Sequence, residues 1–128
     1  MANSEVTAWL SLYIDIWKSG DHSRVAELFT EDAVYYADPF SAPRQGIAAI
    51  EELWRSLGDP PDSFDAVYEP FAVAGDLAVA IGSSRYFDVS RSRIDQEYGN
   101  VFVLRFAADG RCREYREWYM LRGKEGSV

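Results

Sequence analysis

The chain has 128 residues, of which 48% are hydrophobic and 15% aromatic, and this excludes a disordered chain and predicts one domain with a sizeable core. The formal net charge of −8 disfavours nucleic-acid binding, because phosphate contacts need basic surface. A single cysteine, Cys112, excludes an internal disulfide and favours the cytoplasm. The sequence shows neither a basic-then-apolar leader nor an apolar run of about twenty residues, so we expect neither secretion nor a membrane-spanning segment.

The N-terminal third carries helical periodicity. We predict a helix from about Ser4 to Lys18, because apolar residues recur three and four positions apart. These residues are Val6, Trp9, Leu10, Tyr13, Ile14 and Trp17. Ser19-Gly20 ends this helix, and Asp21 or Ser23 caps a short second helix through Phe29.

A short predicted strand over 33–36 ends at Asp38-Pro39, and a third helix follows over Ile47 to Leu57. Asp38 stands between Tyr36 and Phe40, which suits a carboxylate at the mouth of an apolar pocket. Desolvation there raises the pKa and favours general-base chemistry. The alternative is a turn aspartate beside a turn proline, which is a common pairing.

After residue 62 the pattern becomes extended. We predict a strand from Ser63 to Glu69 with a bulge or strand end at Pro70, and a hairpin turn at Gly75-Asp76. Three more strands are expected over Leu77–Phe87, Glu97–Ala107 and Cys112–Leu121. Helices followed by consecutive antiparallel strands indicate an α+β fold. A long twisted sheet of this kind curls into a cone that the helices close at one end, which leaves a pocket between them.

Four segments together resemble a known family. They are Trp17–Asp21, Leu28–Ala33, Pro43–Ile50 and Asp109–Tyr119. The chain resembles the nuclear transport factor 2-like superfamily, near the SnoaL-like polyketide cyclases and the ketosteroid isomerases. The resemblance covers nearly all of residues 1–128 and implies a single cystatin-like domain, a cone-shaped roll with three N-terminal helices. It also implies a homodimer that associates through the sheet.

The steroid isomerases supply two residue matches. Asp38 falls where they keep a proton-shuttling carboxylate, and Tyr13 falls where they keep a phenol that hydrogen-bonds the developing enolate. Their second oxyanion donor corresponds to Phe102, which cannot donate. Asn100 lies two residues earlier on the same strand face and is the alternative donor, displaced by roughly 6–7 Å.

A second polar set comes from the strands. Alternation places Ile81, Ser83 and Arg85 on one strand face, and Tyr115, Glu117 and Tyr119 on one face of the last strand. The resemblance implies that both faces line the cavity. Arg85 with Glu117 is similar to part of the set that epoxide-hydrolysing members use, although a cross-strand ion pair is the structural alternative. The remaining candidate substrate-binding residues are Trp17, Tyr36, Trp54, Asn100, Phe102, Tyr115 and Tyr119.

The sequence predicts an acid–base enzyme, isomerase or cyclase in style, that acts on a small hydrophobic molecule. The alternatives are a non-catalytic binding or assembly module of the same fold, and water addition to an epoxide. No glycine-rich phosphate loop or dinucleotide fingerprint occurs, and the single histidine, His22, gives no metal-site spacing, so we expect neither cofactor nor metal. Val101, Val103, Arg105, Arg116 and Trp118 form the opposite face of the last strands, where we expect a homodimer contact.

Overall fold

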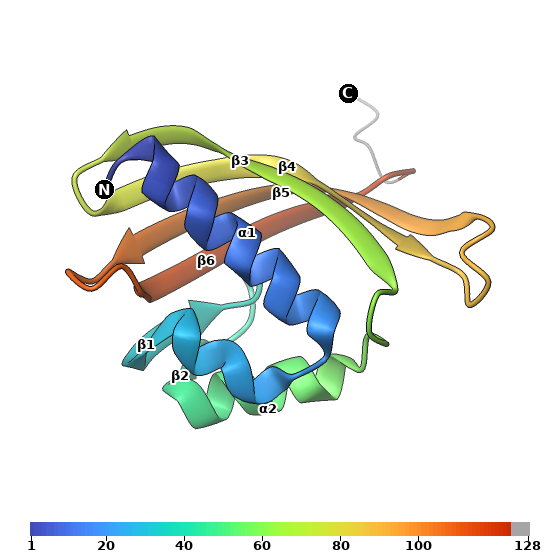
Figure 1. Ribbon diagram of the computed structural model, residues 1–128, viewed down its shortest axis with the longest axis horizontal. Coiled ribbons are helices and arrows are strands. Elements are labelled where there is room, and N and C mark those ends of the chain that lie inside the picture. Colours follow the sequence, from blue (N-terminus) through green and yellow to red (C-terminus); the bar gives the residue numbers. More distant parts are fainter. Residues whose placement is uncertain (124–128) are drawn as a thin grey trace.

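The computed structural model describes residues 1–123 and has an α+β architecture (Figure 1). Two α-helices, α1 (Asn3–Ser19) and α2 (Ile47–Leu57), and the 3-10 helix η1 (His22–Glu27) belong to its first half. The strands are β1 (Phe29–Tyr36), β2 (Arg44–Gln45), β3 (Phe64–Ala74), β4 (Leu77–Phe87), β5 (Ile94–Phe106) and β6 (Cys112–Leu121). The predicted fold class is therefore confirmed.

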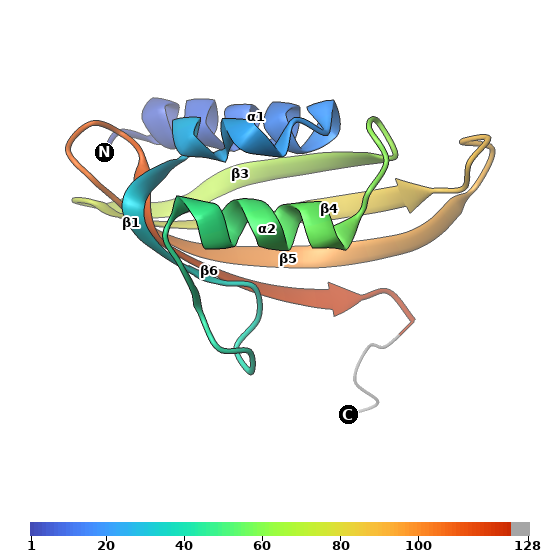
Figure 2. The same cartoon turned by 90° about the horizontal axis from the view of Figure 1, so that it is seen from below.

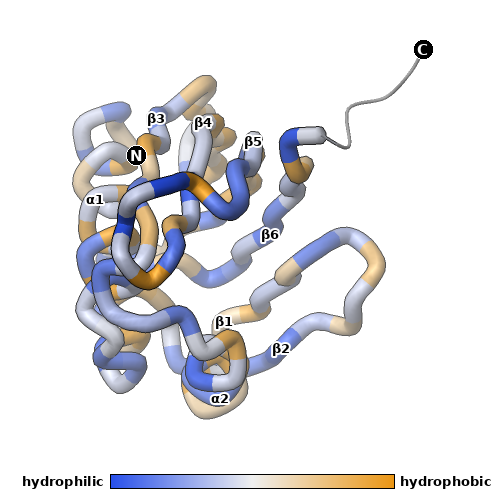
Figure 3. Tube along the Cα trace, turned by 90° about the vertical axis from the view of Figure 1, so that its right-hand side faces the viewer, coloured by the Kyte–Doolittle hydropathy of each residue, from blue (hydrophilic) through white to orange (hydrophobic). Residues whose placement is uncertain are grey.

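The six strands form one sheet in the order β2-β1-β6-β5-β4-β3. All neighbouring pairs are antiparallel except β1 and β6, which run parallel. The sheet curves strongly (Figure 2), and in end view its strands form an arc with α1 and α2 at the open side (Figure 3). The curved sheet is not closed into a barrel, so its concave face is covered by helices rather than by further strands.

Helix α1 forms because its apolar residues recur on one face. Val6, Trp9, Leu10, Tyr13 and Ile16 are buried against the sheet, as the periodicity predicted for all but Ile16. The helix ends at Gly20, whose φ of 72° lies in the left-handed region that glycine adopts without strain. The carboxylate of Asp21 then caps η1 by accepting from the Ser23 backbone N–H at 3.2 Å.

The strands follow the predicted order with longer boundaries. β1 begins at Phe29 rather than at residue 33, and β5 begins at Ile94 rather than at residue 97. β3 continues past Pro70 to Ala74 through a register shift between Pro70 and Ala72, which is the predicted bulge. The two-residue strand β2 was not predicted, since it is too short to carry an alternating pattern and depends on pairing with Val34 and Tyr35 of β1.

The core between the sheet and the helices is mainly aromatic. Rings of Trp9, Tyr13, Phe29, Trp54 and Tyr115 contact one another at centroid distances of 5.5–6.3 Å. Most of these pairs meet edge to face, a geometry that aromatic quadrupoles favour. Within residues 1–123, no helix is both long enough and apolar enough to cross a membrane.

Gly82 of β4 permits the close approach of β3, its neighbouring strand. A Cβ atom at Gly82 would lie 1.9 Å from the Val67 carbonyl oxygen and 2.7 Å from the Tyr68 ring.

We expect Gly82→Ala to lower the free energy of unfolding by about 1–3 kcal/mol, because the crowding forces the two strands apart. Urea denaturation followed by tryptophan fluorescence measures the change. Gly99→Ala in β5 is the matched control, since nothing lies within 4 Å of its Cβ position; equal losses in both variants would contradict the crowding argument.

Candidate functional site

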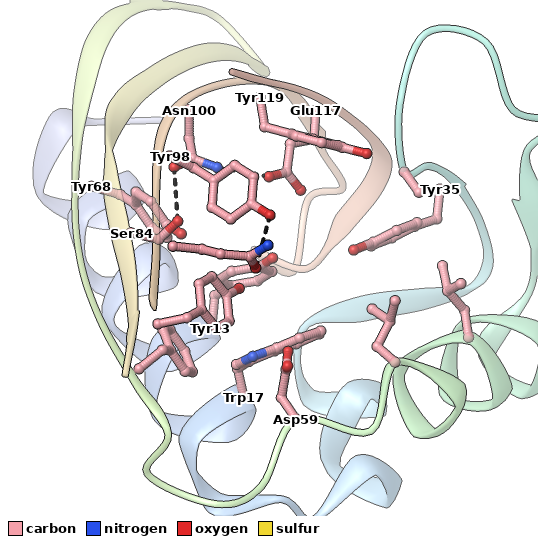
Figure 4. Close-up of a pocket in the computed structure, with 16 residues that line it drawn as sticks. Tyr13, Trp17, Tyr35, Asp59, Tyr68, Ser84, Tyr98, Asn100, Glu117 and Tyr119 are labelled. Atoms are coloured by element: carbon pink, nitrogen blue, oxygen red, sulfur yellow. Dashed lines mark hydrogen bonds between the residues drawn. The ribbon is translucent and has the colours of Figure 1, made fainter. Parts of the chain in front are cut away.

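A pocket of about 290 Å³ lies between the concave face of the sheet, α1 and the C-terminal end of α2 (Figure 4). Its lining includes eight aromatic rings: Tyr13, Trp17, Tyr35, Phe64, Tyr68, Tyr86, Tyr98 and Tyr119. The other lining residues are Ala37, Leu53, Leu57, Asp59, Ser84, Gln96, Asn100 and Glu117. In the part of the chain that the structure describes, the lining thus holds two carboxylates and no lysine or arginine.

Glu117 is the centre of a hydrogen-bond chain inside this pocket. Its Oε1 accepts from the Tyr115 hydroxyl at 2.6 Å, and its Oε2 accepts from the Asn100 amide nitrogen at 2.9 Å. Ser84 Oγ donates to the amide oxygen of Asn100 at 3.1 Å, which fixes the orientation of that amide. Each carboxylate oxygen of Glu117 therefore has its own hydrogen-bond donor, one from β6 and one from β5.

Strand register explains how these groups meet. On the inner face of the sheet, Phe102 lies opposite Glu117, and Asn100 lies opposite Tyr119. Phe102 cannot form a hydrogen bond with Glu117. The Glu117 carboxylate instead bonds diagonally to Asn100, which is the inward residue of β5 that precedes Phe102. Tyr115 occupies the previous inward position of β6, next to Glu117 on the same face.

Burial dominates the electrostatics of Glu117. Desolvation raises its pKa to about 7, and the hydrogen bonds from Tyr115 and Asn100 offset part of this rise. Among residues 1–123, no basic side chain lines the pocket to lower the pKa of Glu117 further. A carboxyl group with this pKa exchanges protons readily near neutrality, which is what general acid–base catalysis requires.

Phenolic hydroxyls gather beside Glu117. The hydroxyls of Tyr13 and Tyr115 lie 3.0 Å apart, and because Tyr115 donates to Glu117, Tyr13 donates to Tyr115. Tyr35 stacks on Tyr115 at a centroid distance of 4.1 Å, and its hydroxyl accepts from Trp54 Nε1 at 3.2 Å. Desolvation raises the pKa of all three phenols, so they stay protonated at neutral pH.

Asp59 is the second carboxylate of the pocket and follows the end of α2. Desolvation raises its pKa, and the nearby Trp17 indole N–H partly opposes this. Trp17 Nε1 is itself buried and has no partner of normal hydrogen-bond geometry in the described part of the chain. Figure 4 shows the Asp59 carboxylate beside the Trp17 ring and Glu117 across the cavity.

Eight of the eleven residues predicted for the site lie in or directly beneath the pocket. Tyr13, Trp17, Asn100, Glu117 and Tyr119 line it. Trp54, Phe102 and Tyr115 are at most 1% exposed and form its floor, where their rings contact Tyr13.

The raised pKa that was predicted for Asp38 was wrong. Its carboxylate lies in the loop after β1 and accepts hydrogen bonds from the backbone N–H groups of Phe40 and Ser41 and from Ser41 Oγ. These bonds lower the pKa of Asp38, whereas a base in an apolar pocket needs a raised pKa. Asp38 therefore corresponds to the alternative interpretation, a turn aspartate beside a turn proline. Tyr36 also lies outside the pocket lining, with the Arg116 guanidinium 3.9 Å above its ring.

The predicted inward face of β4 was also wrong, and Arg85 with it. Arg85 is exposed and pairs with Glu97 at 3.0 Å, which is the structural alternative of a cross-strand ion pair. The inward residues are Ala78, Ala80, Gly82, Ser84 and Tyr86. Four of the five are small, and at Gly82 the Tyr68 ring packs directly against the strand. Alternation then places the larger Val79 and Ile81 on the outer face.

The sequence interpretation missed several pocket residues. Tyr35, Asp59, Tyr68, Ser84, Tyr86 and Tyr98 were not among its candidates. Alternation from Phe64 to Tyr68 in β3 and from Ser84 to Tyr86 in β4 was the signal for three of these residues, Tyr68, Ser84 and Tyr86. Asp59 lies in the helix-ending segment Gly58–Pro61, where no periodicity indicates direction.

Comparisons with known proteins agree with this architecture. The family model described as a SnoaL-like domain matches residues 10–115. A solved structure described as an NTF2-like protein with a cystatin-like fold, from Novosphingobium aromaticivorans, is 25% identical and has a TM-score of 0.64. The match covers 89% of this chain and 79% of that one. A search of curated proteins gave no match.

Burial of Glu117 predicts a pH-dependent stability. The folded pKa of about 7 exceeds the ordinary value of 4.5, so the folded state binds more protons between these values and stability falls as pH rises through this range. We expect the stability of the unmodified protein relative to Glu117→Gln to fall by about 2–3 kcal/mol from pH 5 to pH 8. Urea denaturation of both proteins at each pH measures the difference.

The titratable groups that face Glu117 are Asp59 and the phenols of Tyr13, Tyr35, Tyr68, Tyr86, Tyr98, Tyr115 and Tyr119. All of them are present in both proteins, so their contributions largely cancel in the comparison. A stability difference that stays constant with pH would show that Glu117 titrates like an exposed glutamate.

Proposed function

Because the chain belongs to the SnoaL-like domain family, we propose that it is an acid–base enzyme of isomerase or cyclase type that acts on a small hydrophobic molecule without a cofactor. The observation that supports this most directly is the Glu117 carboxylate, held by two donors inside an aromatic pocket and given a pKa of about 7 by burial. In this proposal Glu117 performs the proton transfer that the sequence pattern had assigned to Asp38.

The proposed reaction begins with proton removal beside a substrate carbonyl. Ionised Glu117 accepts the proton, and the donors Tyr115 and Asn100 hold its two oxygens in place during the transfer. Return of the proton to a different carbon gives isomerisation, whereas attack of the enolate carbon on a second carbonyl of the same molecule gives cyclisation. Both outcomes need a base that is neither permanently charged nor permanently neutral at the working pH.

Phenols beside Glu117 are the proposed source of oxyanion stabilisation. The Tyr35 hydroxyl accepts from Trp54, so its own proton can turn toward a substrate oxygen. Tyr13 donates to Tyr115, so it supports the proton chain to Glu117 rather than acting as the first donor to the enolate. This role differs from the one that the resemblance to the steroid isomerases implies for Tyr13.

Two alternatives receive unequal support. Water addition to an epoxide needs a cation beside the attacking water, and Arg85 is paired with Glu97 on the outer face of the sheet. A non-catalytic binding module is the stronger alternative, because Glu117, Asn100 and Ser84 satisfy one another by hydrogen bonds. The test below therefore measures chemistry rather than binding.

We expect the protein to accelerate deuterium exchange at the carbon beside the carbonyl of 2-tetralone, with a rate that rises as pH increases through about 7. Glu117→Gln should lower the exchange rate by about 100-fold or more, because glutamine cannot accept the proton. Proton NMR in D₂O measures the exchange. Glu114→Gln is the control: Glu114 lies on the same strand but pairs with Arg105 and Arg116 on the outer face.

The same profile tests the role of Asn100. Asn100→Leu removes a hydrogen bond that lowers the pKa of Glu117, so the midpoint of the rate profile should move to higher pH. If the unmodified protein exchanges 2-tetralone no faster than Glu117→Gln does, the non-catalytic alternative is the better account.

A homodimer through the outer face of the sheet is the second part of the proposal. Val67, Val101, Trp118 and Met120 lie on this face and are 39–73% exposed, so the chain alone leaves a row of apolar side chains in water. Isologous pairing about a two-fold axis would cover them. The cytoplasmic location remains a prediction; Cys112, on which it was based, is buried.

We expect Trp118→Glu to convert a dimer into a monomer at micromolar concentration, because it places a charge within the apolar face, next to Val101. Sedimentation velocity measures the change. Val89→Glu is the control, since Val89 is fully exposed in the loop between β4 and β5. A monomeric unmodified protein, or a Trp118→Glu dimer of unchanged affinity, would contradict this interface.

A further inference from the structure

The Asp59 carboxylate lines one end of the pocket, and the proposed proton transfer at Glu117 does not involve it. Asp59 lies across the cavity from Glu117 (Figure 4), and both carboxylates raise the pKa of the same phenol, Tyr86. Two acidic groups therefore face one cavity. Removing an ionised carboxylate from water is costly, so each of these groups either takes up a proton or is stabilised by a positively charged partner.

Among residues 1–123, no basic side chain lies at this end of the pocket. Lys18 and Arg91 both pair with Asp65 outside the pocket, at 2.9 Å and 3.1 Å. The influences that act on the pKa of Asp59 are desolvation and the Trp17 indole, neither of which is a cation. Within the described residues Asp59 therefore has no cationic partner, and its cavity side is the position at which a ligand cation would contact it.

Aromatic rings surround that position. Trp17 lies beside Asp59, and Trp17 and Phe64 meet edge to face at 6.3 Å between centroids. Phe64 stacks on Tyr86 at 5.4 Å, and all three rings line the pocket. The negative faces of such rings attract ammonium groups, and they do so more strongly when water is excluded.

The rest of the lining restricts the ligand further. Leu53, Leu57 and Ala37 form an apolar wall on the α2 side of the cavity. A small metal or an inorganic cation would leave this wall uncovered, and within the described residues no group of three metal-ligating side chains occurs. The occupant therefore combines a charged head with a hydrophobic body.

We infer that the pocket takes a hydrophobic organic amine in its protonated form, with the ammonium group between Asp59 and the rings of Trp17, Phe64 and Tyr86 and the hydrophobic body toward Glu117. This inference deepens the proposed function and rests on it for the reaction at Glu117. Asp59 is then a specificity-determining residue, because it selects a positively charged substrate over a neutral one of the same shape.

Three matched probes test the inference by isothermal titration calorimetry at pH 7.5. Phenethylamine is a cation at this pH, 2-phenylethanol is neutral and phenylacetate is an anion, while the phenyl group is common to all three. We expect phenethylamine to bind at least about tenfold more tightly than 2-phenylethanol, and phenylacetate to bind most weakly. Equal affinity for phenethylamine and 2-phenylethanol would overturn the inference.

The Asp59→Asn variant tests whether the ammonium group of phenethylamine binds beside Asp59. It should lower the affinity for phenethylamine by about tenfold or more and leave the affinity for 2-phenylethanol unchanged. Asp62→Asn is the matched control: it removes the same charge three residues further along, at an exposed position whose φ of 60° asparagine also adopts. Equal effects of both variants would mean that net charge alone attracts the amine.

The Glu117→Gln variant separates this inference from the proposed function. If it retains the preference for phenethylamine, the ammonium group lies at Asp59 as inferred; if it abolishes the preference while Asp59→Asn does not, the placement is overturned. If the protein exchanges 2-tetralone but shows no preference for phenethylamine, the proposed enzyme is supported and the amine site is overturned. If it prefers phenethylamine but exchanges no 2-tetralone, the amine site is supported and the proposed catalysis is overturned.

Discussion

The hydrogen bonds that hold the Glu117 carboxylate under the curved sheet organise the rest of the pocket. A carboxyl group in this position loses most of its hydration, and only the Tyr115 hydroxyl and the Asn100 amide replace it. Each donor depends on a further contact: Tyr115 on the Tyr13 hydroxyl and on stacking with Tyr35, and Asn100 on Ser84. Because the donors do not bring the pKa back to its ordinary value, a carboxyl group with a pKa of about 7 follows from the packing itself.

The sheet achieves this by placing residues of different size on its two faces. Small residues on the inner face of β4 leave room for the Tyr68 ring, and the inner faces of β5 and β6 supply Asn100, Phe102 and Glu117. The charged residues that could neutralise Glu117 lie elsewhere: Arg85 pairs with Glu97, and Arg105 pairs with Glu114. Among residues 1–123 this separation leaves no basic side chain in the lining of the cavity.

Most of the fold was predictable from the sequence, and the reasons are local. The periodicity of α1, the glycine that ends it and the bounds of α2 depend on neighbouring residues, so the sequence predicted them closely. The inner face of β6 was predicted because Tyr115, Glu117 and Tyr119 alternate clearly. The inner face of β4 was not, since its inward residues are smaller than its outward ones, which reverses the usual pattern. Asp38 was misassigned because a loop aspartate and a pocket aspartate have the same sequence signature, and only the Ser41 contacts distinguish them.

The contrast between Asp38 and Glu117 shows how environment rather than residue type assigns the acid–base role. Both are carboxylates that accept hydrogen bonds, Asp38 in the loop just after β1 and Glu117 within β6. Asp38 accepts three from its own exposed loop and has a lowered pKa, whereas Glu117 accepts two in a water-poor cavity and has a raised one. Desolvation outweighs the donors at Glu117 and is outweighed by them at Asp38. In a fold that hosts several chemistries, the carboxylate that can exchange protons near neutral pH is therefore the one that the aromatic pocket encloses.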